Sequence, residues 1–429
     1  MKYPSSPNAK SSVNLEVLKL KSVVGIVNLQ ESNDLLRELA ATRAVEALPF
    51  AGRYRVVDFA LSNMINSGIN SVGLMLPDYS RAVLDHIRSG KDWDLARRRD
   101  GLTYLPAAIP ARDARNGDLK DIYANLDFAE LSDKKFVLFV NASYIYNIDF
   151  KDVLSFHKKS DADITVIYKT IDEDKEGQTV TIETSTNGIV TDLAESNGAK
   201  KGSKVVMSAY LMPVPTFAYI VRSTYERGGQ DFLLDGIIRH ADEHKISAYE
   251  HKGFVARINS TAGFYKANRD CLNPDVWEEL FMDRERPIYT KVKDEVPVQY
   301  KDTAEVKNSL IANGCIIRGR VENSIIFRGV KIGKGAVVKD CILMQRCDIQ
   351  DGARVENIIA DKNVIVTKNR WLKGSENIGW VGVVDGNEIA AKNYFMREFK
   401  FGGFVRLVLL DIDLKILGKK KEPKRLNID

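Results

Sequence analysis

The sequence has few cysteines and no long hydrophobic run, and each shortage excludes a class of protein. Four cysteines occur among 429 residues, and none forms a CxxC pair. A disulfide framework or a zinc site is therefore not expected, and buried free thiols in a reducing compartment are the simpler interpretation. No stretch approaches the roughly 20 apolar residues of a membrane span, and residues 1–22 lack the apolar region of a signal peptide. We expect a cytoplasmic protein with no membrane contact.

Basic residues are not concentrated either. The formal net charge is +5, and the only dense basic runs are 97–99 and 419–421. A nucleic-acid-binding protein gathers its basic side chains on one stripe, so we expect no nucleic-acid partner. With 44% hydrophobic and 28% charged residues, the composition is that of an ordinary globular protein.

The length requires at least two domains, because 429 residues exceed one ordinary hydrophobic core. We predict a flexible N-terminal segment at 1–22, a first domain at 23–295, a second at 296–385 and a C-terminal tail of unknown role at 386–429. Within the tail, residues 404–417 fit either a strand or an amphipathic helix, and the lysine-rich end is predicted to be disordered.

Alternating strands and helices are predicted in the first domain. The apolar run at 23–27 is typical of a buried parallel strand. Apolar residues then recur at helical spacing from Val56 to Ile65, before Gly68. Further strands are predicted at 71–76, 136–140 and 162–168, and further helices at 79–88 and 152–159. This order indicates an α/β fold with a mostly parallel sheet and helices on both faces.

An internal repeat of 17 residues starts after residue 300. Val321, Val338 and Val355 occupy the same place in three successive copies. The short period, rich in glycine and β-branched residues, predicts the coils of a triangular parallel β-helix, in which each coil stacks its aliphatic side chains on the next. An α-helical solenoid is the alternative, but it does not suit so short a period. Because the sides of β-helices often pair with other subunits, we expect an oligomer.

The two halves of the chain resemble one enzyme family. Residues 48–63, LPFAGRYRVVDFALSN, are similar to a motif of the bacterial ADP-glucose pyrophosphorylases, and residues 309–364 are similar to the C-terminal domain of the same family. The resemblance implies an α/β Rossmann-like nucleotidyltransferase domain followed by a left-handed parallel β-helix. It also implies a reaction of ATP with glucose 1-phosphate that yields ADP-glucose and pyrophosphate for glycogen synthesis.

The sequence departs from this family where the reaction is most demanding. Attack on the α-phosphate of ATP needs cations around the phosphate oxygens, and it needs glycine-rich backbone close to the triphosphate. The family's glycine-rich loop corresponds here to residues 26–33, which contain no glycine and add the negative charge of Glu31. The lysine of its Arg-Ala-Lys-Pro-Ala motif is replaced by Val45, and Glu46 follows. We interpret both changes as losses of phosphate binding.

The positions that the resemblance assigns to magnesium are also changed. Ser143 replaces the aspartate of the family's Gly-Asp-His-Ile-Tyr motif, and Arg257 replaces the aspartate of Asp-Val-Gly-Thr. Magnesium is held by carboxylates, and a cation in a ligand position repels it, so we expect no metal site and no cofactor. Asp149 and Asp58 remain nearby in the sequence, and we interpret each as a cap or a surface residue rather than a metal ligand.

The fourth change is in the sugar-phosphate clamp, where Ser196 replaces the lysine of the family's Glu-Lys-Pro motif. Together, the degenerate positions predict a catalytically inactive, regulatory subunit of glucose-1-phosphate adenylyltransferase. The expected partner is a catalytic homologue, in a heterotetramer whose activity or effector affinity this chain shifts. A weakly active adenylyltransferase is the alternative. A β-helix acyltransferase would need a histidine, and residues 303–370 contain none.

Two arginines match family positions that bind an activator phosphate. Arg43 and Arg55 hold these positions, and a guanidinium suits a phosphorylated small-molecule effector because it donates two hydrogen bonds at once. The neighbouring family lysine and histidine are here Thr42 and Pro49, so we expect weaker or altered selectivity. Ordinary ion pairs of both arginines are the alternative interpretation.

Overall fold

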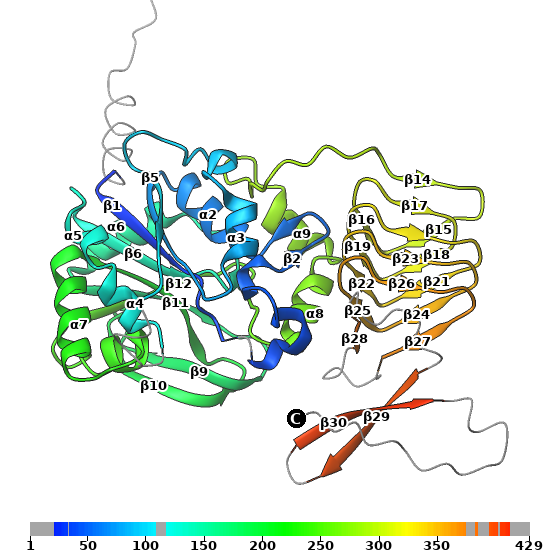
Figure 1. Ribbon diagram of the computed structural model, residues 1–429. Helices are drawn as coiled ribbons and strands as arrows, with labels where there is room; N and C mark the ends of the chain where they lie inside the picture. The colour runs from blue at the N-terminus through cyan, green and yellow to red at the C-terminus, as the bar shows by residue number, and fades with distance from the viewer. Residues whose placement is uncertain are drawn as a thin grey trace, which may run out of the picture. The chain divides into compact units, whose positions relative to one another are not determined.

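The chain divides into two compact units in the computed structural model (Figure 1). The residues that the structure describes are 21–32, 34–108, 117–374, 382–384, 394–401 and 404–411. Unit 1 comprises the chain up to Leu48 together with 54–259 and 275–292, and unit 2 comprises 49–53, 260–274 and the chain from Lys293. Most of the predicted flexible segment at 1–22 lies outside the described residues.

In the described part of unit 1, a mixed sheet of nine strands forms the centre. Seven strands follow one path, in the order β10 (Val190–Ala199), β9 (Lys175–Thr184), β11 (Lys204–Pro213), β6 (Phe136–Asn141), β1 (Val23–Asn28), β4 (Ser71–Met75) and β5 (Gly101–Leu105). Off this path, β8 (Ile164–Thr170) pairs with β11, and β12 (Ile246–Glu250) pairs with β8. Strands β1, β4, β5 and β6 pair in parallel, whereas β11 is antiparallel to β6, β8 and β9. The prediction of a mostly parallel sheet is therefore wrong for the part of the sheet around β11, where β9 and β10 also form an antiparallel hairpin.

Helices cover both faces of this sheet, as predicted. Along β1, Val23 and Val27 pack into one apolar cluster, and Val24 and Ile26 pack into another, because successive side chains of a strand point to opposite faces. The first cluster includes residues of α2 (Val57–Asn66), α3 (Arg81–Ile87) and α6 (Phe150–Ser160), and the second includes residues of α4 (Leu119–Ala124), α7 (Val214–Glu226) and the π-helical turn η4 (Phe232–Ile238). The remaining helical segments are η1 (Asp34–Ala40), η2 (Val45–Ala47), η3 (Lys91–Trp93), α5 (Asp127–Glu130) and α9 (Pro274–Phe281).

Unit 2 contains a parallel β-helix, as the repeat predicted, with three sheets of five short strands in the described residues. The first sheet is β14 (Gln299–Tyr300), β17 (Ile316–Ile317), β20 (Lys331–Ile332), β23 (Asp348–Ile349) and β26 (Ile365–Val366). The second is β15 (Glu305–Lys307), β18 (Arg320–Glu322), β21 (Val337–Lys339), β24 (Arg354–Glu356) and β27 (Trp371–Lys373). The third is β16 (Leu310–Ile311), β19 (Ile325–Ile326), β22 (Ile342–Leu343), β25 (Ile358–Ala360) and β28 (Gly382–Val384). Val321, Val338 and Val355 pair in register and are fully buried inside the coils.

One corner of each coil explains why asparagine or aspartate recurs in the repeat. Asn323, Asp340 and Asn357 lie at equivalent places in successive coils, with φ angles of 47°, 53° and 54°. Asparagine and aspartate adopt this left-handed conformation more readily than other non-glycine residues. The turn geometry therefore selects these two residue types every 17 positions.

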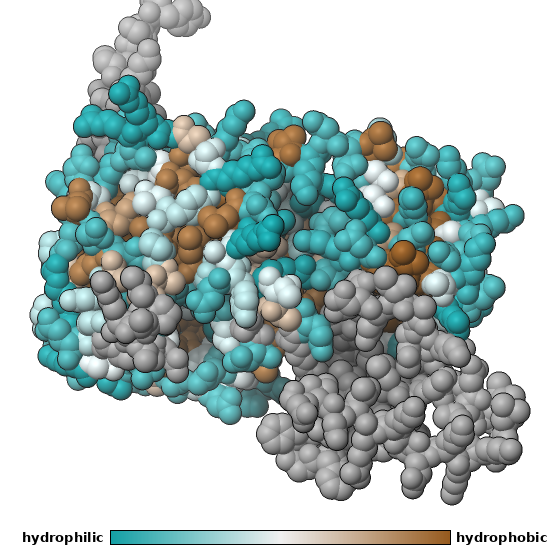
Figure 2. Space-filling view, in the orientation of Figure 1, coloured by the Kyte–Doolittle hydropathy of each residue, from teal (hydrophilic) through white to brown (hydrophobic). Residues whose placement is uncertain are grey.

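Charges alternate along the second sheet of the β-helix. The residues stacked in one column are Lys307, Glu322, Lys339, Glu356 and Lys373. Each carboxylate therefore has an ammonium group on both neighbouring strands, an arrangement that stabilises adjacent strands. Hydrophilic side chains dominate the right-hand edge of the coils in Figure 2.

Two segments that precede the β-helix in the sequence belong to unit 2. Helix α8 (Thr261–Asp270) contacts the coils through Tyr265, whose hydroxyl donates to the carbonyl of Asp340 (2.7 Å), and through Arg269, which pairs with the Asp340 carboxylate (2.9 Å). The segment 49–53 includes β2 (Pro49–Phe50), and the amide of Ala51 donates to Asn268 (2.9 Å).

The described part of the tail forms an antiparallel hairpin of β29 (Tyr394–Phe401) and β30 (Phe404–Asp411). Of the two alternatives for 404–417, the strand is correct for 404–411, and the remainder lies outside the described residues together with the lysine-rich end. The four cysteines all lie in described ranges and are buried and free, as predicted.

Candidate functional site

A cleft of about 810 Å³ lies within unit 1, beside the carboxyl ends of the central strands. Asn28 ends β1 and Asn141 ends β6, and both line the cleft. Ligand sites of α/β sheets form at this edge because the carboxyl ends of parallel strands meet there and their connecting loops diverge. The fold therefore places the predicted nucleotide loop, which follows β1, on the wall of the cleft.

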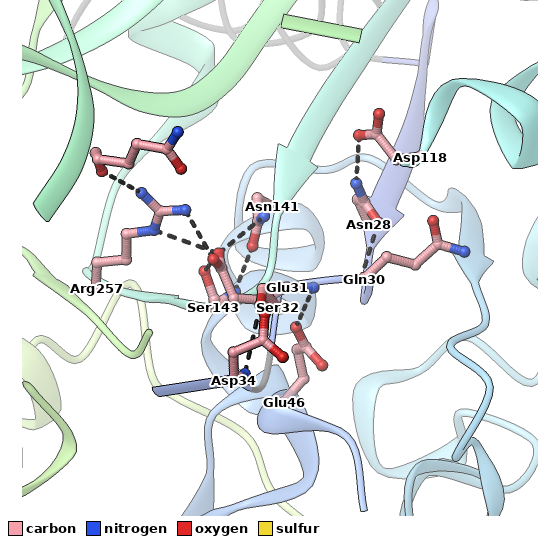
Figure 3. Close-up of polar contacts among 11 residues, drawn as sticks. Asn28, Gln30, Glu31, Ser32, Asp34, Glu46, Asp118, Asn141, Ser143 and Arg257 are labelled. Carbon is pink, nitrogen blue, oxygen red and sulfur yellow. Dashed lines mark hydrogen bonds and ion pairs between the residues drawn. The ribbon is translucent and has the colours of Figure 1, made fainter. Parts of the chain in front are cut away.

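Glu31, in that loop, is the centre of a polar network (Figure 3). Its side chain is 5% exposed, and Arg257 pairs with it through Nη2 (2.7 Å to Oε1) and Nε (3.3 Å to Oε2). The Ser143 hydroxyl donates to Oε2 (2.6 Å), and the Asn141 amide lies 3.3 Å from the same oxygen. The negative charge of the loop is thus neutralised inside the protein.

The two positions that the resemblance assigned to metal-binding aspartates converge on this carboxylate. Ser143 precedes β7 (Tyr144–Ile145) and Arg257 ends β13 (Ala256–Arg257), and these short strands pair with Arg257 opposite Tyr144. The Arg257 guanidinium lies 5.6 Å from the centre of the Tyr144 ring. Tyr144 and Glu31 raise the pKa of Arg257 above its ordinary value, so the guanidinium stays charged.

These residues do not fit a divalent cation. Magnesium prefers carboxylate, carbonyl and water oxygens, whereas the structure brings a hydroxyl and a guanidinium to the two expected positions. Across the described residues, no three His, Cys, Asp or Glu side chains are grouped so that they could hold a metal ion. Asp149 caps α6 by accepting a hydrogen bond from the amide of Lys151 (2.9 Å), so of its two expected roles, cap or surface residue, the structure shows the cap.

Val45 lines the cleft but is itself 1% exposed, and it begins the short helix η2. Glu46, the next residue, is completely buried beneath the loop. One of its oxygens lies 3.4 Å from the Glu31 amide, and the other has no hydrogen-bond partner among the described residues. Burial raises the pKa of Glu46 to about 8, so its carboxyl group is mainly neutral at pH 7. Neither residue offers a cation to phosphate.

Ser196 lies on β10, where its hydroxyl donates to the carbonyl of Gly198 (2.6 Å). It is not among the described residues that line the cleft, whereas its neighbour Glu195 is. The side chain at this position turns back to its own backbone.

A group of carboxylates that also lines the cleft was missed by sequence reasoning. Asp118 accepts from the Asn28 amide (2.9 Å) and from the Phe232 backbone (2.9 Å), and Asp121 accepts from Gln30 (2.5 Å). Burial, reinforced by the charge of Asp231, raises the pKa of Asp118 to about 7. The described lining of the cleft carries six acidic side chains and three basic ones, so it offers few cations to an anion such as triphosphate.

The two candidate effector arginines lie close enough to influence each other. Arg43 is buried, lines the cleft and donates from Nε to the carbonyl of Leu39 (2.9 Å). Arg55 donates to the carbonyl of Ala82 (2.8 Å). Burial lowers the pKa of Arg55, and Arg43 lowers it further against the opposing effect of Asp58.

Sequence reasoning missed two further cations of this basic group, Lys291 and Arg88. Burial and the charges of Arg88 and Arg55 lower the pKa of Lys291, whose ammonium group donates to the carbonyl of Asp85 (2.7 Å). No local pattern in the sequence signals this contact, because Lys291 lies 206 residues from Asp85.

Comparison with known proteins identifies the family. The Nucleotidyl transferase profile matches residues 34–278, and the profile of the GlmU-like C-terminal hexapeptide matches residues 295–374. None of the described helices combines the length and apolar character needed to cross a membrane.

Among curated relatives, the glycogen biosynthesis protein GlgD of Bacillus subtilis (strain 168) is 32% identical over 81% of this chain and 91% of its own length. GlgD of Geobacillus stearothermophilus is 35% identical over 74% of this chain and 82% of its own length. The glucose-1-phosphate adenylyltransferase of Geobacillus stearothermophilus is 31% identical over 71% of this chain and 80% of its own length. Proteins of both names therefore match to a similar degree. The chain belongs to the glucose-1-phosphate adenylyltransferase family, also called the ADP-glucose pyrophosphorylases.

Proposed function

We propose that this chain is a catalytically inactive, regulatory subunit of a glucose-1-phosphate adenylyltransferase in glycogen biosynthesis. It assembles in the cytoplasm with a catalytic homologue, as a heterotetramer, and shifts the activity or effector affinity of that partner. The observation that carries the proposal is the ion pair between Glu31 and Arg257, because the resemblance assigns the Arg257 position to a magnesium ligand.

The reaction concentrates negative charge on the phosphoryl oxygens of ATP. Such charge is stabilised by cations and by preorganised hydrogen-bond donors. Here Arg257 is already neutralised by Glu31, Val45 has no charge, and acidic side chains outnumber basic ones in the described lining. Loss of one such donor typically lowers turnover about 100- to 1000-fold, and these losses affect several parts of the same site.

The relatives are compatible with this role. Two of them carry the name glycogen biosynthesis protein, whereas the third one reported above is named for the adenylyltransferase reaction. A subunit that does not catalyse the reaction acts on a catalytic partner only if it contacts two states of that partner differently.

The basic group of unit 1 supports a phosphorylated effector. Arg43, Arg55 and Lys291 are drawn together by the fold, with Arg88 beside them. Replacement of Arg55 by glutamine should raise the effector concentration for half-activation of the assembled complex about tenfold or more, because a charged hydrogen bond to phosphate is lost. Arg81→Gln, on the exposed side of α3, is the matched control and should leave this concentration unchanged.

Co-expression with a catalytic homologue tests the proposal. The purified complex should contain both chains, and the turnover or effector response of the partner should differ from that of the partner alone. No co-purification, or identical kinetics with and without this chain, would refute the regulatory role. Magnesium-dependent pyrophosphate release by the purified chain alone would instead favour the weakly active adenylyltransferase.

A further inference from the structure

The ion pair in the cleft joins parts of unit 1 that are far apart in the sequence. Arg257 ends β13, Glu31 lies 226 residues earlier in the loop after β1, and Gln178 lies on β9. Nε and Nη2 of Arg257 face Glu31, and Nη1 donates to the carbonyl of Gln178 (3.5 Å). One guanidinium therefore connects the loop, the β7–β13 pair and the β9–β10 hairpin.

Nε, Nη1 and Nη2 of this guanidinium each already donate to a protein oxygen. Its side chain is 30% exposed, whereas that of Glu31 is 5% exposed and also accepts from Ser143. An incoming phosphate would have to compete with a carboxylate that is already fixed by several donors. A divalent cation would have to displace the arginine itself, and Ser143 would offer it only a hydroxyl.

We propose that Arg257 is an internal substitute for the divalent cation, and that its pair with Glu31 keeps the walls of the cleft together without metal or nucleotide. The inference rests on the proposed non-catalytic role, because a working active site would require the pair to open. Here one conformation is maintained by the chain itself, so the partner contacts a subunit whose cleft does not respond to substrate.

Hydrogen exchange of the full chain, followed by mass spectrometry, tests the proposal. Arg257→Ala should accelerate exchange roughly tenfold or more in three segments together: the loop after β1, β7 and β9. The physical reason is that a buried carboxylate without its cation is strongly destabilising. Millimolar Mg²⁺ and ATP should leave exchange in the wild-type chain unchanged.

Removal of both charges separates the ion pair from the packing of its side chains. In the double variant Glu31→Gln, Arg257→Ala, the amide hydrogens of the three segments should exchange more slowly than in Arg257→Ala alone, because no unpaired charge remains. This comparison also remains informative if the single variant folds poorly. Arg222→Ala is the matched control, because Arg222 pairs with Glu130 at the surface of unit 1 (2.6 Å) and should leave all three segments unaffected.

The proposal is wrong if Arg257→Ala leaves exchange unchanged, if only one of the three segments responds, or if Mg²⁺ and ATP protect the wild-type cleft. These outcomes are distinct from failure of the proposed function, which is measured on the rate of the catalytic partner. A chain that modulates its partner but lacks the predicted exchange pattern would refute only the substitution of the metal by Arg257.

Discussion

The substitution Glu46→Gln should make the stability of unit 1 less dependent on pH. Glu46 is completely buried, and one of its carboxyl oxygens has no hydrogen-bond partner among the described residues. Burial raises its pKa from 4.5 to about 8. The folded state therefore retains the proton over a range in which the unfolded chain has lost it, and stability must fall as the pH rises through this range.

The size of the effect follows from the difference between the two pKa values. Between pH 4.5 and pH 8, the folded state binds about one more proton than the unfolded state, which costs about 1.4 kcal/mol for each pH unit. From pH 5 to pH 8 the wild-type chain should lose about 4 kcal/mol of unfolding free energy through this group. Glutamine resembles the neutral carboxyl group in shape and does not ionise, so the variant should lack this component.

Urea unfolding measures how the unfolding free energies of the wild type and the variant depend on pH. Both proteins are unfolded at pH values from 5 to 8.5, and the transition is followed by a signal specific to unit 1. The two proteins should have similar stability at about pH 5, and the variant should become progressively more stable than the wild type up to about pH 8. Parallel stability curves across this range would show that Glu46 ionises normally and would refute the reasoning.

Three further predictions concern the degenerate cleft and the β-helix. The double variant Val45→Lys, Ser143→Asp should show no measurable pyrophosphate release, because the loop after β1 still has no glycine; substantial turnover would count against the inactive role. Glu322→Lys should place like charges on three adjacent strands and lower the melting temperature of unit 2. This loss should diminish in high salt, and a salt-independent loss would exclude a charge effect. Gly319→Ala should lower the unfolding free energy of unit 2 by about 1–3 kcal/mol, because the added Cβ would lie 2.4 Å from the carbonyl oxygen of Ala336. Chemical denaturation measures this loss, and an unfolding free energy equal to that of the wild type would show that the corner can adjust.

Local patterns allowed much of the fold to be predicted. The apolar run of β1 and the helical spacing of α2 lie in short windows, and the repeat of Val321, Val338 and Val355 is visible without any knowledge of contacts. Strands β9 and β10 escaped prediction because they are largely exposed and polar, so they lack the apolar pattern that marks a buried strand.

The candidate site could be predicted only in part. The missing glycines, Val45 and the exchange of an aspartate for Arg257 were visible in the sequence, but the pairing of Arg257 with Glu31 was not. That contact spans 226 residues and depends on how β7 and β13 meet. The carboxylates Asp118 and Asp231 likewise come from separate segments, and neither belongs to a recognisable motif.

The most direct test of whether this cleft can assemble the reactants is the binding of Mn²⁺ together with ATP by the purified full chain. Electron paramagnetic resonance in the presence of glucose 1-phosphate measures this binding. We predict that addition of the chain leaves the spectrum of Mn²⁺–ATP unchanged. A protein-bound Mn²⁺ signal that requires ATP and approaches one ion per chain would contradict an inactive cleft neutralised by Arg257.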